Sequence, residues 1–277
     1  MSKKINLNEI STEKSSNYNN LENMSVNDIL YNINNEDQIV PMTIKKSIPA
    51  IATLIEKCIA VLKNGGRIFY IGSGTSGRLG IVDASECPPT YGVDPGVVIG
   101  IIAGGDSAIR KSIEGAEDSL IQGYRDLKAH KINPHDIVIG ISASGRTPYV
   151  VGALKKCQEK NIATGCIVCS SNSIVSTYSD YPIEVIVGPE FVTGSTRMKA
   201  GTAEKLVLNM ITTTSMICTG HVEGNRMIDM QLSNSKLTER GIKTVMEKTQ
   251  LSYSNAKKLL EINDNKIRKA LESFRKK

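Results

Sequence analysis

The stretch FYIGSGTSGRLG, from Phe69 to Gly80, decides the fold. It reads as a short apolar strand, then a turn of glycine, serine and threonine over residues 72–77, then the start of a helix. The turn has the spacing G-x-G-x-x-G, which is the fingerprint of a dinucleotide-binding unit. The same turn would also suit another anion, because a helix that starts behind a strand presents unpaired N–H groups to any phosphate. Features elsewhere in the chain distinguish these two interpretations.

Five short apolar runs predict five strands. They are rich in Ile and Val almost throughout, which is typical of strands covered on both faces. These runs span residues 67–71, 97–102, 136–141, 164–169 and 183–187. Helical patterns flank or separate them over about 44–62, 107–129, 147–160 and 195–219. We therefore expect an α/β fold with a doubly wound, mostly parallel five-stranded sheet flanked by helices.

The two ends of the chain differ from this sheet. Residues 1–43 read as a polar arm that leads into a helix, and residues 231–277 carry only charged helical patterns. We expect three parts: an N-terminal arm and helix (1–43), a sheet domain (44–230) and a small C-terminal helical appendage (231–277). The formal net charge is +6, and residues 232–277 alone hold 12 Lys or Arg against 5 Asp or Glu. A nucleic acid could bind such a tail, but a solvated helical face is the simpler interpretation, so we expect no nucleic-acid partner.

The sequence gives no sign of export or of a metal site. The N-terminus lacks an apolar leader and no apolar stretch reaches about 18 residues, so we expect a cytoplasmic protein with reduced thiols and no membrane span. Cys166 and Cys169 form a C-x-x-C in a predicted strand. Positions i and i+3 of a strand point to opposite faces. The three histidines have no metal-type spacing, so we expect no metal.

A second hydroxyl-rich turn follows the third predicted strand, with the sequence SASGRTP over residues 142–148. Both turns should lie at the carboxyl ends of parallel strands, where ligands bind, and Ser and Thr add uncharged donors there. The dinucleotide interpretation needs an acid about 20 residues further on, at the end of the second strand. The acid at that place, Asp106, follows Gly77 by 29 residues. Two such turns favour a compact phosphate over a pyrophosphate, and over glycines and serines that merely form tight turns.

Two carboxylates stand near these turns in the sequence. Glu86 precedes Cys87-Pro88-Pro89, and because proline breaks helices we expect Glu86 in a stiff loop. Glu117 stands in SIEGAEDS, which we expect to begin the helix after the second strand. Two carboxylates beside a phosphate site suggest general acid–base chemistry on a sugar phosphate. Spacing alone is equally compatible with a helix-end Glu86 and a surface Glu117 that have no function.

Four longer motifs resemble one known family. They are IGSGTSGRLGIVDASECPPTYG, AGGDSAIRKSIEGAEDS, ASGRTPYV and VTGSTRMKAGTAEKLVLNM. They look like the N-acetylmuramic acid 6-phosphate etherases, within the wider group of sugar isomerase (SIS) domains, and the match runs from about residue 8 to 240. The resemblance implies an SIS fold for residues 44–230. It also implies a lyase that cleaves the D-lactyl ether of N-acetylmuramic acid 6-phosphate with water, giving N-acetylglucosamine 6-phosphate and D-lactate in cell-wall sugar recycling. A cytoplasmic homodimer without metal or organic cofactor, with sites near the subunit interface, is implied as well.

The same motifs suggest roles for individual residues. Glu86 of SECPP corresponds to the family's catalytic acid, and Glu117 of EGAED corresponds to its second essential carboxylate. The wider SIS pattern implies phosphate contacts from Ser76, Ser142, Ser144 and Thr147. Weaker substrate contacts are implied for Ser73, Thr75, Ser195, Arg197 and Lys199.

Two other functions use the same turns. Another SIS enzyme, such as an aldose–ketose isomerase, would share them but need not have ASECPP and EGAED. A non-catalytic sugar-phosphate-binding regulator, like the regulator of glucokinase, can keep the turns and lose the chemistry. The presence of both Glu86 and Glu117 favours catalysis.

Overall fold

A five-stranded parallel sheet forms the centre of the computed structural model, which describes residues 10–276. The strand order is β2-β1-β3-β4-β5, and neighbouring strands are parallel throughout. The strands are β1 (Ile68–Gly72), β2 (Val98–Ile102), β3 (Ile137–Ser142), β4 (Ala163–Val168) and β5 (Tyr181–Glu184). Each overlaps its predicted range, so the predicted parallel sheet is confirmed.

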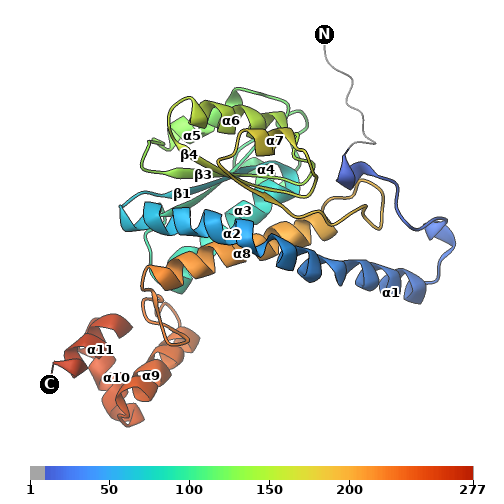
Figure 1. Ribbon diagram of the computed structural model, residues 1–277. Helices are drawn as coiled ribbons and strands as arrows, with labels where there is room; N and C mark the ends of the chain where they lie inside the picture. The colour runs from blue at the N-terminus through green and yellow to red at the C-terminus, as the bar shows by residue number, and fades with distance from the viewer. Residues whose placement is uncertain (1–9, 277) are drawn as a thin grey trace.

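Helices cover both faces of the sheet (Figure 1). One face carries α2 (Ile39–Lys63), α3 (Gly74–Tyr91) and α8 (Lys199–Cys218), and the other carries α5 (Gln122–Ala129), α6 (Pro148–Gln158) and the short α7 (Ile174–Thr177). Alternate residues of β1 enter different apolar clusters, with Ile68 and Tyr70 in the first and Phe69 and Ile71 in the second. The period-2 alternation of a strand thus builds a core on each side, as the doubly wound prediction requires.

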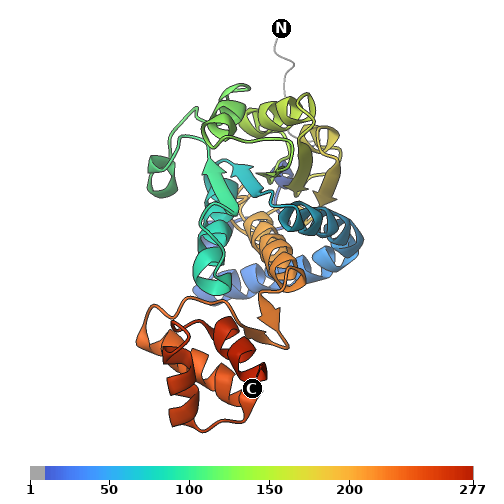
Figure 2. The ribbon, with the colours of Figure 1, turned by 90° about the vertical axis from the view of Figure 1, so that its left-hand side faces the viewer.

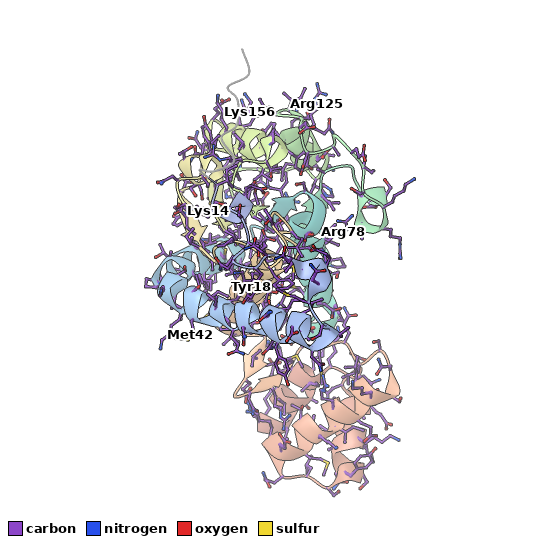
Figure 3. All side chains as sticks on the ribbon, turned by 90° about the vertical axis from the view of Figure 1, so that its right-hand side faces the viewer. Lys14, Tyr18, Met42, Arg78, Arg125 and Lys156 are labelled. Atoms are coloured by element: carbon purple, nitrogen blue, oxygen red, sulfur yellow. The ribbon has the colours of Figure 1, made fainter. Side chains whose placement is uncertain are left out.

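The N-terminal region lies across the carboxyl ends of the strands. Short 3-10 turns at Ser11–Glu13 and Leu21–Asn23 precede α1 (Val26–Asp37). Ser16 donates its hydroxyl to the carbonyl of Phe191 and its N–H to Thr193, which fixes this segment to the chain before α8. Figure 3 is viewed from this side and labels Lys14 and Tyr18 of the segment. Residues 1–9 of the predicted arm lie outside the described residues.

The C-terminal residues form a cluster of their own below the sheet (Figure 2). A hairpin of β6 (Val222–Glu223) and β7 (Arg226–Met227) leads to α9 (Ser235–Thr249), α10 (Tyr253–Glu261) and α11 (Ile267–Arg275). These helices bury an apolar core that includes Ile242, Leu260 and Leu271. The helical character of this region is confirmed, whereas the boundaries at 43 and 230 stay a prediction.

Two local predictions are wrong. The predicted helix 107–129 consists of α4 (Ser107–Arg110) and α5, with an irregular segment at 111–121 between them. Gly115 takes a φ of 72° in this segment, which no helix tolerates, and the carbonyl of Glu117 accepts a hydrogen bond from the N–H of Tyr149. Tertiary contacts with α6 therefore replace the helical ones.

The loop expected at Pro88-Pro89 is the second error, because α3 continues through both prolines to Tyr91. Proline removes the bonds to the carbonyls of Ala84 and Ser85, but it does so only near the end of the helix. The N–H of Gly92, which has a φ of 67°, donates to the carbonyl of Pro88 and closes the last turn of α3.

Among the helices of residues 10–276, none combines the length and the apolar character that a membrane span requires.

Candidate active site

The opening turn joins β1 to the first turn of α3. Gly72 and Gly77 lie back to back, since a Cβ on Gly72 would come within 2.8 Å of the Gly77 nitrogen. These two glycines of the G-x-G-x-x-G pattern therefore serve close packing of strand against helix. The first N–H groups of α3 have no partner within the helix and point out of the carboxyl edge of the sheet. This end of α3 is suited to an anion.

The second turn lies beside the first, because Gly72 of β1 pairs with Ile141 of β3. Ser142 and Thr147 share a hydrogen bond of 2.8 Å between their hydroxyl oxygens. The Oγ atoms of Ser142 and Ser144 accept the N–H groups of Gly145 and Arg146. Gly145 has a φ of 66°, and a Cβ there would lie 2.2 Å from that of Ser173, so no larger residue fits. The structure thus brings the two predicted phosphate turns together.

Glu117 reaches the first turn from the irregular segment after α4. Ser73 donates its hydroxyl to Oε2 of Glu117 at 2.6 Å. Both residues line a cavity of about 310 Å³ that Glu114 and Arg78 also border. The Arg78 guanidinium donates to the carbonyls of Ala108 and Ile109, and so holds α4 against the cavity. An exposed carboxylate therefore stands beside the end of α3 that is suited to an anion.

Glu86 lies elsewhere in the same chain. It is exposed on α3, ten residues after Ser76, and a rise of 1.5 Å per residue places the two about 15 Å apart along the helix. The helix runs from the carboxyl edge of the sheet back toward the opposite edge, where the C-terminal helices lie (Figure 1). One copy of the chain therefore does not bring Glu86 to the two turns, contrary to the expected position beside them.

Ser76 faces a carboxyl group that the motifs had not singled out. Its hydroxyl lies 2.8 Å from Oε1 of Glu204, which is on the second turn of α8. Glu204 is 1% exposed, and burial raises its pKa to about 8 even though the bond from Ser76 opposes that shift. Glu204 belongs to the motif GSTRMKAGTAEK, but only the packing of α8 on α3 reveals its partner.

The remaining predicted contacts divide into accessible and buried groups. Ser195 and Thr75 are half-buried and Arg197 is exposed. Lys199 is 2% exposed, and its ammonium pairs with the carboxylate of Glu36 on α1. Its N–H donates to Glu190, which burial gives a raised pKa. The Lys199 charge is thus buried and already paired within the protein.

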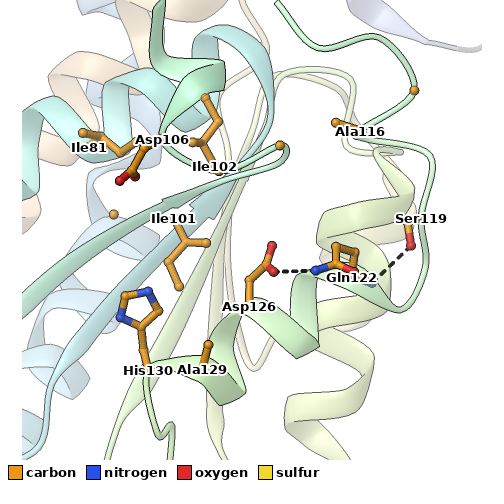
Figure 4. Close-up of a pocket in the computed structure, with 14 residues that line it drawn as sticks. Ile81, Ile101, Ile102, Asp106, Ala116, Ser119, Gln122, Asp126, Ala129 and His130 are labelled. Carbon is orange, nitrogen blue, oxygen red and sulfur yellow. Dashed lines mark hydrogen bonds between the residues drawn. The ribbon is translucent and has the colours of Figure 1, made fainter.

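A second hollow, of about 520 Å³, lies along the outer edge of β2 (Figure 4). Asp126 there accepts hydrogen bonds from Gln122 and from the hydroxyl of Tyr149. None of the predicted site residues, all of which the structure describes, lines this hollow. The cavity beside Ser73 holds a predicted site residue, Glu117, and lies at the end of α3, so it is the better candidate site.

The C-x-x-C pair points to opposite sides of the sheet, as predicted. Cys166 belongs to the apolar cluster under α6, whereas Cys169 belongs to the cluster under α8. Burial raises the pKa of both thiols, which keeps them protonated. Across residues 10–276, no group of three or more His, Cys, Asp or Glu side chains is placed to hold a metal ion.

Known proteins share this sequence and this fold. The glucokinase regulatory protein N-terminal SIS domain family matches residues 50–158, and the SIS domain family matches residues 119–214. Solved structures include a putative phosphosugar isomerase from Bacteroides fragilis, with a TM-score of 0.54 and 15% identity over 76% of this chain and 94% of its own. A phosphoheptose isomerase from Francisella tularensis has a TM-score of 0.51 and 16% identity over 70% of this chain and 99% of its own. At such identities these two structures support the fold alone.

Relatives with much higher identity carry one description. An N-acetylmuramic acid 6-phosphate etherase from Christiangramia forsetii is 54% identical over 264 residues, which cover 95% of this chain and 96% of the relative. One from Bacteroides thetaiotaomicron is 52% identical over 96% of this chain and 95% of its own length. One from Actinobacillus pleuropneumoniae is 47% identical over 95% of this chain and 86% of its own length. The chain therefore belongs to the N-acetylmuramic acid 6-phosphate etherase family, on an SIS fold.

Proposed function

We propose that the protein cleaves the D-lactyl ether of N-acetylmuramic acid 6-phosphate, releasing D-lactate and N-acetylglucosamine 6-phosphate. The observation that carries this proposal is the bond from Ser73 to Glu117, which holds a carboxylate beside the end of α3. The high identity to the etherases supports the same reaction. We further propose that it acts in the cytoplasm.

The phosphate of the substrate would bind at the two turns. Ser76, Ser142, Ser144 and Thr147 supply hydroxyl groups there, and the first turn of α3 supplies N–H groups and a partial positive charge. These groups lie on adjacent strands, so one phosphate can meet both turns. The sugar then extends toward the cavity that Glu117 borders.

The reaction needs a base at C2 and an acid at the ether oxygen. In the open-chain sugar, the C1 aldehyde acidifies the C2 proton. We assign Glu117 as the base that removes this proton. Lactate then leaves C3 as an acid protonates the ether oxygen, and water adds across the C2–C3 double bond. We assign Glu86 as that acid. Positioned acids and bases contribute about 10² to 10⁴-fold each, so Glu117→Gln and Glu86→Gln should each lower kcat by at least that factor.

The position of Glu86 favours a homodimer with shared sites. Glu86 is exposed and about 15 Å along α3 from Ser76, so it would act in the site of a second copy. Large apolar side chains are exposed on α1, with Val26 at 73%, Leu30 at 60% and Tyr31 at 71%, and on α3, with Val82 at 57%. Such faces are typical of surfaces that bind another protein chain.

The direct test is lactate release in deuterated water. The pure protein is incubated with N-acetylmuramic acid 6-phosphate, and D-lactate and the deuterium content of the product are measured. Lactate with deuterium at C2 supports elimination followed by addition. Binding of the sugar phosphate without any lactate would favour the non-catalytic regulator.

Hybrid dimers test whether the site is shared. Glu86→Gln and Glu117→Gln chains with different tags are co-expressed, and the dimers that carry both tags are purified. If Glu86 serves the partner, one of the two sites keeps both carboxylates, and about half of the wild-type activity returns. If both carboxylates act within one chain, the hybrid stays as inactive as its parents.

A further inference from the structure

Glu204 is a buried carboxyl group that the proposed reaction does not use. It projects from α8 toward α3, and its Oε1 lies 2.8 Å from Oγ of Ser76, the third residue of α3. Its Oε2 is fully buried and has no hydrogen-bond partner within residues 10–276. A buried carboxylate oxygen without a partner is costly, whereas the carbonyl oxygen of a neutral acid costs much less. The site therefore favours a protonated Glu204.

The proton on Glu204 decides which way the Ser76 hydroxyl donates. An ionised carboxylate can only accept, so it takes the hydrogen of Ser76 and leaves only oxygen lone pairs for a ligand. A neutral carboxyl group can donate from Oε1 to Oγ of Ser76, which frees the Ser76 hydrogen. Phosphate oxygens accept hydrogen bonds, so only the second arrangement makes Ser76 a donor to a phosphate.

We propose that Glu204 is a residue that positions the phosphate group. As a neutral acid, Glu204 donates a hydrogen bond to Ser76 and so turns the Ser76 hydroxyl toward the ligand. Ionisation of Glu204 reverses this bond and adds a negative charge behind the phosphate turn. This inference rests on the proposed sugar-phosphate site, but it does not depend on turnover. It predicts that the affinity for sugar phosphates falls as Glu204 loses its proton.

The surroundings of Glu204 support a proton at neutral pH. Burial raises the pKa of Glu204 to about 8, and the negative charge of Glu190 adds to that effect. Cys169, at the end of β4, is the other titratable group close by, and burial together with Glu204 and Glu190 holds the pKa of its thiol well above the usual value. Of the cations on α8, Lys199 is paired with Glu36 and Lys205, the residue after Glu204, is exposed. The pH window for a change in affinity is therefore near and above 8.

The test is equilibrium binding of N-acetylglucosamine 6-phosphate from pH 7 to 9.5, measured by calorimetry. A phosphate monoester is already a dianion over this range, because its second pKa is about 6. For the wild type, the dissociation constant should rise with pH above 8, approaching tenfold per pH unit when binding requires the proton. Binding does not require catalysis, so absence of lactate release would overturn the proposed function without affecting this result.

Matched variants distinguish hydrogen-bond donation by residue 204 from the packing of its side chain. In Glu204→Gln the amide still donates to Ser76 but cannot ionise, so binding at pH 9 should be tighter than in the wild type and independent of pH. Glu204→Met keeps the volume but offers no donor, and Ser76→Ala removes the hydroxyl, so both should bind weakly at every pH. The proposal is overturned if Glu204→Gln shows the same loss of affinity with pH as the wild type. It is also overturned if Glu204→Gln and Glu204→Met bind equally weakly at pH 7.

Discussion

Replacing Lys199 by Met should destabilise the fold strongly without weakening substrate binding. Lys199 is 2% exposed, and its ammonium pairs with Glu36, which is 8% exposed on its side chain. Removing one partner of a buried pair leaves the other charge unpaired and typically costs about 3 to 5 kcal/mol. For a chain of this size, such a loss lowers the melting temperature on the order of 10 °C.

The pair also joins two parts of the molecule. Glu36 lies on α1, and Lys199 begins α8, where its N–H and that of Ala200 donate to Glu190. Burial raises the pKa of Tyr18 in the N-terminal segment, and the charge of Glu36 and a hydrogen bond to it add to that shift. We therefore expect Lys199→Met to loosen α1 first, so that limited proteolysis should cut the chain near residues 25–38 before the sheet unfolds.

A double-mutant cycle gives the sharpest form of the assay. The free energy of unfolding is measured by urea titration for the wild type, Lys199→Met, Glu36→Gln and the double variant. Because the double variant leaves no unpaired buried charge, it should be more stable than Lys199→Met alone.

The exposed pair of Lys156 and Glu159 supplies the control, and Lys156→Met should leave the midpoint of the urea titration unchanged within error. The reasoning is refuted if Lys199→Met lowers the free energy of unfolding by less than about 1 kcal/mol. It is also refuted if the double variant loses the full sum of the two single losses. An increase in KM with unchanged stability would instead support the substrate contact that the motifs imply for Lys199.

Two further outcomes follow from buried contacts. The pKa of Glu204 is held at about 8 against an ordinary 4.5, so the folded state keeps a proton that the unfolded chain loses. Relative to Glu204→Gln, the wild type should lose about 1.4 kcal/mol of stability per pH unit as pH rises from 5 to 8, which urea titrations across this range would measure. A Cβ on Gly152 would lie 1.8 Å from the carbonyl oxygen of Leu120, so Gly152→Ala should cost about 1 to 3 kcal/mol and displace the segment that carries Glu117, lowering kcat. Gly96→Ala, where no atom lies within 4 Å, is the control, and equal stability of the two variants would contradict this account.

The sheet could be predicted because a local residue pattern marks each strand. A short run such as Ile68–Gly72 is apolar on both faces, and glycine and hydroxyl residues mark its end. The segment 111–121 carries no such signal. Its polar residues suit a helix as well as a turn, and the contacts that decide against the helix come from Tyr149 and Gly152, which lie about thirty residues further along the chain.

Glu86 shows a different limit of prediction from sequence. Two consecutive prolines normally end a helix, but α3 loses only the bonds to the carbonyls of Ala84 and Ser85 and continues for two more residues to Tyr91. The continued helix carries Glu86 about 15 Å from Ser76 along the axis. The motif singles out Glu86, but only the length of α3 leads to the proposal that Glu86 serves the site of a second copy.

The pairing of hydroxyl and carboxyl groups in the first turn of α3 is the least predictable feature and the most informative one. Ser73 and Ser76 are three residues apart, yet Ser73 donates to Glu117, 44 residues on, and Ser76 contacts Glu204, 128 residues on. The first carboxylate is exposed to solvent, whereas the second is buried, and burial raises its pKa to about 8. In the proposed mechanism, this turn of Ser and Thr orients the base Glu117 on its outer side and is itself oriented by the neutral acid Glu204 on its inner side. A G-x-G-x-x-G pattern shows where such a turn lies, but the two carboxyl groups that the packing brings to it determine its chemistry.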